Sequence, residues 1–128
     1  MQYLVLIYED ESRFATGYPE DEFAEYGAFG KKHANAIKGG NALQPTATAK
    51  TVRVRDKKAL TTDGPFAETK EQLAGYYILD CLDLDEAIEW AKRIPTACQG
   101  REGCIEIRPI DHLPFRPAIP GTTGILFP

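Results

Sequence analysis

The sequence LAGYYILD, residues 73–80, decides the fold, because it is largely apolar on both of its alternating sides. Successive side chains of a β-strand point to opposite faces of a sheet, so a segment of this kind is typical of a strand that is buried on both faces. The segment QYLVLIY, residues 2–8, has the same pattern. We therefore predict that residues 2–8 and 73–80 form two adjacent central strands of one sheet.

A helix is predicted after the first central strand. It begins at Pro19, a residue that suits the first helical position, and the acidic residues that follow favour the positive end of the helix dipole. It is expected to end at Gly39-Gly40, since glycine commonly terminates helices. The helical spacing of apolar and small residues predicts its inward face: Phe23, Tyr26, Gly30, Ala34 and Ile37.

A second helix is predicted after the second central strand. Asp83 is a suitable N-cap, and Glu86 three residues later completes a capping-box pattern. The helix is expected to end near Ile94, because Pro95 cannot continue it. Two further segments, residues 51–56 and 104–108, alternate in the manner of half-exposed strands and are expected nearer the sheet edges. A short turn after the first leads into residues 59–62, which connect to the segment at Asp63.

The predicted order is strand, helix, hairpin, central strand, helix, strand. This is the split βαβ arrangement of a ferredoxin-like α+β fold, with an antiparallel-rich sheet and two helices on one face. The apolar residues on the other face then need a cover. A second copy of the chain is the simplest one, because two-fold dimers dominate among soluble oligomers. We therefore predict a homodimer whose sheets pack face to face.

The length and charge of the chain limit its possible functions. Its 128 residues predict one domain, residues 1–110, followed by a proline-rich C-terminal tail, residues 111–128, that is either an extended arm or a frayed end. The net charge of -4 and the pI near 5.2 argue against direct nucleic-acid binding. Without a long apolar run or a signal-like segment, the protein is expected to be cytoplasmic, with no membrane partner.

Cysteine spacing and the known motifs indicate neither a metal nor a cofactor. Cys81, Cys98 and Cys104 contain no C-x-x-C pair and are expected to be reduced. Together with His112 they provide residue types that bind zinc, but their spacing matches no structural zinc pattern. The sequence also lacks the common nucleotide-binding, metalloprotease and calcium-loop motifs.

The segment Asp63-Gly64-Pro65-Phe66 is the main candidate for chemistry. Gly64 and Pro65 favour a tight turn, which brings ionisable side chains together beside a buried strand. We predict Asp63 and Glu71 as catalytic carboxylates, because carboxylates near an ammonium group can hold different protonation states. The predicted ligand-binding residues are Tyr3, Tyr26, Phe66, Glu68, Lys70 and Tyr76.

Each of these residues also has a purely structural interpretation. Asp63 can accept backbone hydrogen bonds within its turn, and Lys70 can pair with Glu68 or Glu71 at the surface. Phe66 more often anchors such a loop on the core than stacks on a ligand. Tyrosines on central strands usually pack in a core or a dimer interface with the hydroxyl satisfied.

The segment 61–73, with Gly75-Tyr76-Tyr77 after it, closely resembles the DGPF-domain family within the YCII-related superfamily. The resemblance extends from residues 3–8 to residues 106–109. It implies a small bacterial cytoplasmic dimer with a ferredoxin-like, dimeric α/β barrel-like fold, often encoded near sigma factors. The resemblance also suggests where an active site would lie. Superfamily members with a proposed active site look as though they use a histidine on the first helix together with an aspartate after the second helix. His33 lies too near the glycine pair for that pattern, and residues 94–96 contain no aspartate, so we do not expect the dyad here.

Two functions are consistent with these observations. The first is a dimeric small-molecule-binding or regulatory domain, linked to transcription through a sigma-factor-related protein partner. The alternative is an enzyme that carries out acid/base chemistry on a small cyclic or unsaturated organic substrate, a class that the superfamily resemblance alone supplies. The surroundings of Asp63 and Glu71 discriminate between the two functions: a carboxylate that faces a closed apolar cavity with a raised pKa favours the enzyme, whereas one saturated by backbone amides favours a structural turn.

Overall fold

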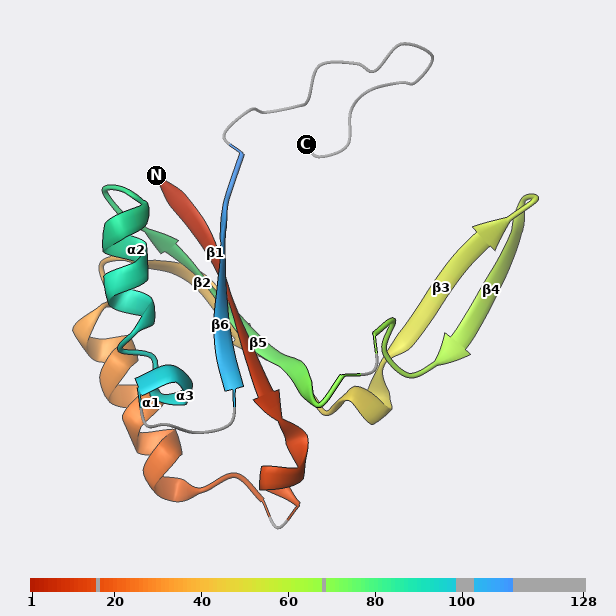
Figure 1. Ribbon diagram of the computed structural model, residues 1–128, viewed down its shortest axis with the longest axis horizontal. Helices are drawn as coiled ribbons and strands as arrows, with labels where there is room; N and C mark the ends of the chain where they lie inside the picture. The colour runs from red at the N-terminus through yellow and green to blue at the C-terminus, as the bar shows by residue number, and fades with distance from the viewer. Residues whose placement is uncertain (16, 68, 99–102, 112–128) are drawn as a thin grey trace.

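The computed structural model describes residues 1–15, 17–67, 69–98 and 103–111. Within these ranges the chain forms a four-stranded sheet, a separate two-stranded hairpin and three α-helices (Figure 1). The strands are β1 (Gln2–Asp10), β2 (Ile37–Ala42), β3 (Lys50–Arg55), β4 (Lys58–Asp63), β5 (Glu71–Asp80) and β6 (Gly103–Pro109). The helices are α1 (Glu20–Lys32), α2 (Leu84–Ala91) and α3 (Pro95–Cys98), with the 3-10 helices η1 (Glu11–Phe14) and η2 (Thr46–Thr48).

The four-stranded sheet has the order β2-β5-β1-β6, and each neighbouring pair is antiparallel. The two segments predicted as central strands lie side by side as β1 and β5, and β6 lies at an edge as predicted. The units β1-α1-β2 and β5-α2-β6 are the two halves of a split βαβ arrangement. The predicted ferredoxin-like α+β fold is therefore confirmed.

The helices cover one face of the sheet, and the core lies between these layers (Figure 1). Tyr3, Val5 and Ile7 of β1 point toward the helices and alternate with half-buried neighbours. They form a cluster with Leu79 of β5 and with the helix-side residues Phe29, Ala87, Ala91 and Ile94. Burying one such side chain fully contributes about 1.5–3 kcal/mol, so this face supplies most of the apolar burial.

The opposite face of the sheet carries Leu4, Leu6 and Tyr8 of β1 beside Tyr76 and Ile78 of β5. These side chains are half-buried within the single chain. No helix of the described residues covers them (Figure 1). The predicted cover by a second copy of the chain stays a prediction.

The predicted end of the first helix is wrong. α1 ends at Lys32, and Gly39-Gly40 lie in the edge strand β2 instead. The reason is a close approach between strands: Gly40 has a φ of +159°, and a Cβ there would lie 2.6 Å from the Tyr76 carbonyl oxygen. Gly40 therefore admits the neighbouring strand, and the glycine pair does not stop a helix.

The predicted inward face of the first helix is also partly wrong. Phe23 is 74% exposed, whereas Glu22 and Phe29 are buried. The buried set is displaced by one residue because Glu22 has an ion-pair partner that makes its burial possible. Tyr26 is half-buried and packs against the core as predicted.

The segments 51–56 and 59–62 form the hairpin β3–β4, which projects away from the sheet (Figure 1). Its turn lies at Asp56 and Lys57, whose φ values of 50° and 64° are those of a type I′ turn. The hairpin is therefore confirmed, but it does not belong to the main sheet of the described residues. The second strand of the fold is β2, which sequence reasoning assigned to the helix.

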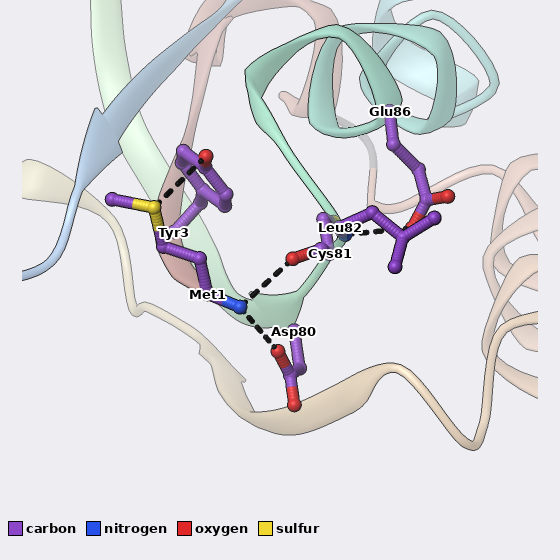
Figure 2. A network of polar contacts seen from close by, with 6 residues as sticks. All are labelled: Met1, Tyr3, Asp80, Cys81, Leu82 and Glu86. Atoms are coloured by element: carbon purple, nitrogen blue, oxygen red, sulfur yellow. Dashed lines mark hydrogen bonds and ion pairs between the residues drawn. The ribbon is translucent and has the colours of Figure 1, made fainter.

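The second helix begins as predicted. The Asp83 side chain accepts a hydrogen bond of 2.9 Å from the Glu86 backbone N–H. The Glu86 side chain accepts one of 3.1 Å from the Leu82 N–H (Figure 2). α2 ends at Ala91, and Pro95 begins the separate helix α3. Residues 112–128, which hold most of the predicted tail, lie outside the described residues. No helix in the described ranges has both the length and the apolar character needed to cross a membrane.

Candidate functional site

A pocket of about 610 Å³ lies at the end of the sheet where β1 continues into η1. Its lining comes from the end of β1, from η1 and the segment after it, from the first turns of α1, and from the β2–β5 pair with the loop that follows β2. Most of these side chains are apolar or aromatic. A concave, largely apolar site with a few polar groups is typical of small-molecule binding.

Phe14 and Tyr18 form one wall of the pocket. Their rings are stacked, with centroids 4.8 Å apart and an interplanar angle of 10°. The Arg13 guanidinium carbon lies 4.9 Å from the centroid of the Phe14 ring. Arg13 Nη2 also donates hydrogen bonds of 3.0 and 3.1 Å to the two carboxylate oxygens of Glu22. Because Glu22 is fully buried in α1, this ion pair holds η1 and the aromatic wall against the helix.

The opposite side of the pocket is held by hydrogen bonds between separate segments. Glu11 of η1 accepts one hydrogen bond from the Thr46 N–H and one from the Thr46 hydroxyl, both of 2.8 Å. On the edge of the sheet, Asn41 Nδ2 donates to the Tyr76 hydroxyl at 3.1 Å. The first contact fixes the loop after β2 beside η1, and the second fixes the ring of Tyr76.

Glu9 brings a buried carboxylate to the pocket lining, with only 3% of its surface exposed. Its Oε1 accepts a hydrogen bond of 2.6 Å from Thr96 Oγ1. The same Thr96 oxygen is hydrogen bonded to the Tyr26 hydroxyl. Among the described residues, Thr96 is the only hydrogen-bond partner of the Glu9 carboxylate. Three elements, β1, α1 and α3, therefore meet in one chain of oxygen atoms.

The position of Thr96 depends on how α3 packs against β6. Thr96 is fully buried and follows Pro95, whose fixed φ suits the first position of a helix. Gly103, at the start of β6, allows the approach: a Cβ there would lie 2.6 Å from Thr96 Cγ2 and would clash with the Tyr8 carbonyl oxygen. The hydroxyl of Thr96 thus reaches Glu9 because the facing residue has no side chain.

Two tyrosines of the pocket lining have raised pKa values. Burial raises the pKa of Tyr26, against an opposing effect of its hydrogen bond with Thr96, and the Glu9 carboxylate adds to the increase. Burial, followed by the Glu9 carboxylate, also raises the pKa of Tyr18. Both phenols therefore stay protonated at neutral pH and act as hydrogen-bonding groups.

The two predicted catalytic carboxylates do not belong to the described lining of this pocket. Asp63 ends β4, where its side chain is 85% exposed and pairs with Lys50. Glu71 begins β5, is half-buried, and lies opposite Asp10 of β1. Glu68 lies outside the described residues.

The turn predicted at Gly64 is present, with a φ of +96°. The Gly64 N–H donates to the Ala49 carbonyl oxygen at 2.8 Å. Phe66 does not anchor this loop on the core: it is 77% exposed, and the Arg53 guanidinium carbon lies 5.1 Å from its ring centroid. Lys70 is exposed. Phe66 and Lys70, two of the loop residues predicted to bind a ligand, therefore lie at the surface, apart from the described pocket lining.

The three predicted ligand-binding tyrosines lie in two different places. Tyr26 and Tyr76 both line the pocket. Tyr3 lies on the helix-covered face, is 2% exposed, and donates a hydrogen bond of 3.4 Å to Met1 Sδ (Figure 2). Tyr3 and Tyr76 thus lie on opposite faces of the sheet.

His33 is a buried packing residue at the end of α1. Its ring centroid lies 5.2 Å from that of Trp90, and burial, followed by the nearby Arg93, lowers its pKa. Within the described ranges, no group of three His, Cys, Asp or Glu side chains is placed to hold a metal ion. Two of the residues considered above as zinc ligands, the Cys98 side chain and His112, lie outside the described residues.

Sequence reasoning missed Glu9, Thr96 and the Phe14–Tyr18 wall. The prediction ends the first strand at Tyr8, whereas β1 continues to Asp10. The inward positions of β1 are every second residue, so position 9 is also inward, and a carboxylate there is an anomaly that signals a buried polar group. Thr96 carries no comparable signal, because its position depends on the packing of α3.

The comparisons with known proteins agree on the fold. The family model of the YCII-related domain matches residues 1–114. An uncharacterised protein of Rhizobium meliloti (strain 1021) is 42% identical over 115 residues, which cover 86% of this chain and 92% of the relative. The chain is also similar in structure to a 5-chloro-2-hydroxyhydroquinone dehydrochlorinase from Burkholderia phenoliruptrix, in complex with 2,5-dihydroxybenzoquinone. That match has a TM-score of 0.57 at 13% identity and covers 88% of this chain and 95% of the other, so it shows the fold alone.

Proposed function

The chain belongs to the YCII-related domain family, and from this premise we propose that it binds a small, ring-shaped organic compound in the pocket beside η1. The observation that carries the proposal is the composition of the lining, in which a stacked aromatic wall faces a few polar groups. Flat apolar rings stack favourably on such walls, and the polar groups orient them. The volume of about 610 Å³ suits a single small molecule.

The structural neighbour supplies the first compound to test. Its ligand, 2,5-dihydroxybenzoquinone, is a flat ring with polar substituents at its edge. This chemistry fits a pocket that combines Phe14 and Tyr18 with the hydroxyl of Tyr26 and the carboxylate of Glu9. The low identity between the two chains limits the analogy to this choice of ligand class.

Acid/base catalysis on such a ring is the second candidate function. It is favoured by Glu9, a carboxylate that is 3% exposed and lines an apolar pocket. Carboxylates in such surroundings are common general acids and bases. Conversion of a bound hydroxylated or halogenated ring, followed by mass spectrometry, distinguishes catalysis from binding: Glu9→Gln is expected to abolish turnover and to retain binding.

A matched pair of phenylalanine variants tests where the ligand binds. Phe23 lines the pocket and is 74% exposed, whereas Phe66 lies in the loop after β4 and is 77% exposed. Phe23→Ala is expected to weaken the binding of 2,5-dihydroxybenzoquinone at least threefold in calorimetry, and Phe66→Ala to leave it unchanged. Loss of binding in Phe66→Ala alone would move the site to the predicted loop. No binding of this compound or of related hydroxylated rings would refute the proposed function.

A cytoplasmic homodimer is part of the same proposal. The half-buried apolar side chains on the open face of the sheet include Leu4, Leu6 and Ile78, and a second copy packed there would remove them from water. The free thiols of Cys81 and Cys104 are in keeping with a reducing compartment. Light scattering at micromolar concentration is expected to give twice the chain mass, and the mass of one chain would contradict the dimer. The predicted regulatory role and sigma-factor partner gain no support from the relatives.

A further inference from the structure

The hydroxyl groups of Tyr26 and Thr96 link the pocket to the buried Glu9 carboxylate, and their hydrogen bonds have a defined direction. Thr96 has a single hydroxyl proton, and it is donated to Glu9 Oε1 at 2.6 Å. The Thr96 oxygen can then only accept from Tyr26, so the Tyr26 proton points to Thr96. The Tyr26 oxygen also accepts: the Thr96 backbone N–H acts on it, and a donor from the pocket can share its remaining lone-pair density.

The purely structural interpretation is that this network ties α3 to the sheet. Two observations go beyond that interpretation. Glu9 and Tyr26, at the two ends of the network, both line the pocket. Burying the Glu9 carboxylate only to hold α3 on the sheet would cost free energy, because it is 3% exposed and its one hydrogen-bond partner among the described residues is a neutral hydroxyl.

We propose that Tyr26, Thr96 and Glu9 form a proton relay that accepts the proton of an acidic hydroxyl on the ring bound in the pocket. The proposal rests on the proposed function and specifies its ligand class: enols and electron-poor phenols, in which the ring stabilises the oxygen anion. An aliphatic alcohol holds its proton too tightly for a carboxylate to accept it.

The proton transfer is balanced within the ligand and these three residues. The O–H bond of the ligand breaks, its electron pair stays on the ligand oxygen, and its proton bonds to the Tyr26 oxygen. The original Tyr26 proton moves to Thr96, and the Thr96 proton moves to Glu9 Oε1. The net change is one ionised ligand oxygen and one neutral Glu9, while Tyr26 and Thr96 are neutral again with the direction of their hydrogen bonds reversed.

The relay requires that its middle groups stay neutral at rest. Burial raises the pKa of Tyr26, so the phenol does not compete with Glu9 as the final acceptor. Thr96 is 0% exposed, so water has no access to the middle of the chain of atoms. Glu9 is therefore the terminal base, Tyr26 is the group that contacts the ligand, and Thr96 is a positioning residue.

Proton uptake on binding tests the role of Glu9. An anionic ligand oxygen and an ionised Glu9 repel each other in a buried site, so the complex holds one shared proton. At a pH at which 2,5-dihydroxybenzoquinone is ionised in water, calorimetry in two buffers of different ionisation enthalpy is expected to show uptake of about one proton per complex. The affinity then falls about tenfold for each unit of increasing pH. The Glu9→Gln variant is expected to bind without this uptake, because an amide does not accept the proton.

The preference for a hydroxyl over an ether tests Tyr26 and Thr96. The wild-type protein is expected to bind 2,5-dihydroxybenzoquinone at pH 5 at least tenfold more tightly than its dimethyl ether. Tyr26→Phe and Thr96→Val are expected to reduce this ratio below threefold, and Thr96→Ser, which keeps the hydroxyl, to retain it. Thermal melting of each variant verifies that it is folded.

The outcomes separate the relay from the proposed function. Unchanged proton uptake in Glu9→Gln, or an unchanged hydroxyl preference in Thr96→Val, would overturn the relay and leave the binding pocket in place. A failure of both compounds to bind the wild-type protein would overturn the proposed function together with the relay.

Discussion

Replacing Glu22 with glutamine tests how the aromatic wall of the pocket is held. Glu22 has 1% of its side chain exposed and Arg13 has 22%, and the carboxylate accepts two hydrogen bonds from Arg13 Nη2. Removing one partner of a fully buried ion pair costs about 3–5 kcal/mol. Because Arg13 is partly in water and can rehydrate, we expect a lower cost for Glu22→Gln, about 2–3 kcal/mol of the free energy of unfolding.

Urea denaturation followed by circular dichroism measures this loss. With an m-value of about 1.5 kcal/mol/M, the unfolding midpoint is expected to fall by about 1–2 M. Glu20→Gln is the matched control, because Glu20 is exposed and lies in the same first turn of α1. Both variants lose a favourable interaction with the helix dipole, worth about 0.3–1 kcal/mol, but only Glu22→Gln loses the ion pair with Arg13.

A midpoint for Glu22→Gln no lower than that of Glu20→Gln would refute this reasoning. A double variant gives a second test: Glu22→Leu combined with Arg13→Met replaces both charges with apolar groups. It is expected to recover at least half of the stability that Glu22→Gln loses, because no unpaired charge remains buried.

Three further predictions concern the rest of the fold. Asp83→Ala removes the N-cap of α2 and is expected to cost about 1 kcal/mol in urea denaturation, whereas Asp83→Asn retains most of the stability. Burial and Arg93 lower the pKa of His33, so the folded protein binds this proton less readily than the unfolded chain, and stability is lost as the pH falls through about 6.5. The melting point of the wild-type protein is therefore expected to be lower at pH 5 than at pH 8, and His33→Phe is expected to remove the share of this difference that comes from His33. Cys81 is buried with a pKa raised to about 11, so iodoacetamide at pH 8 is expected to modify exposed Cys104 at least tenfold faster, as peptide mass spectrometry would show.

The sequence predicts the elements that are governed by local chemistry. The alternation of residues 2–8 and 73–80 identifies the two central strands, and Asp83 marks the start of α2. Sequence reasoning misses the edge strand β2 because its sequence, IKGGNA, lacks the alternation of a typical strand and has Ile37 as its one β-branched residue. It is a strand because Gly40 allows close pairing with β5, and that contact is visible only in three dimensions.

In the candidate site, too, some residues are predictable from local sequence and others depend on three-dimensional packing. Tyr26 and Tyr76 are predicted from sequence as ligand-binding residues, and both line the pocket. The charged loop around Asp63 attracts attention in the sequence because charge and turn signals coincide there, yet it extends from an exposed hairpin. Thr96 takes part only because α3 packs closely over Gly103. The packing of α3 over Gly103 leaves no periodic signal in the sequence.

Two buried glutamates at this end of the molecule are compensated in different ways, and the difference indicates their roles. Glu22 is held by a guanidinium group, so its charge is balanced whether or not a ligand is present. Glu9, in contrast, has only the Thr96 hydroxyl as a hydrogen-bond partner among the described residues, and it lines a pocket. A buried carboxylate paired with a guanidinium group stabilises the fold, whereas a buried carboxylate hydrogen bonded to a neutral hydroxyl has no opposite charge beside it. This difference is the physical reason why we assign Glu22 to structure and propose Glu9 as the group that exchanges a proton with a ligand in the pocket.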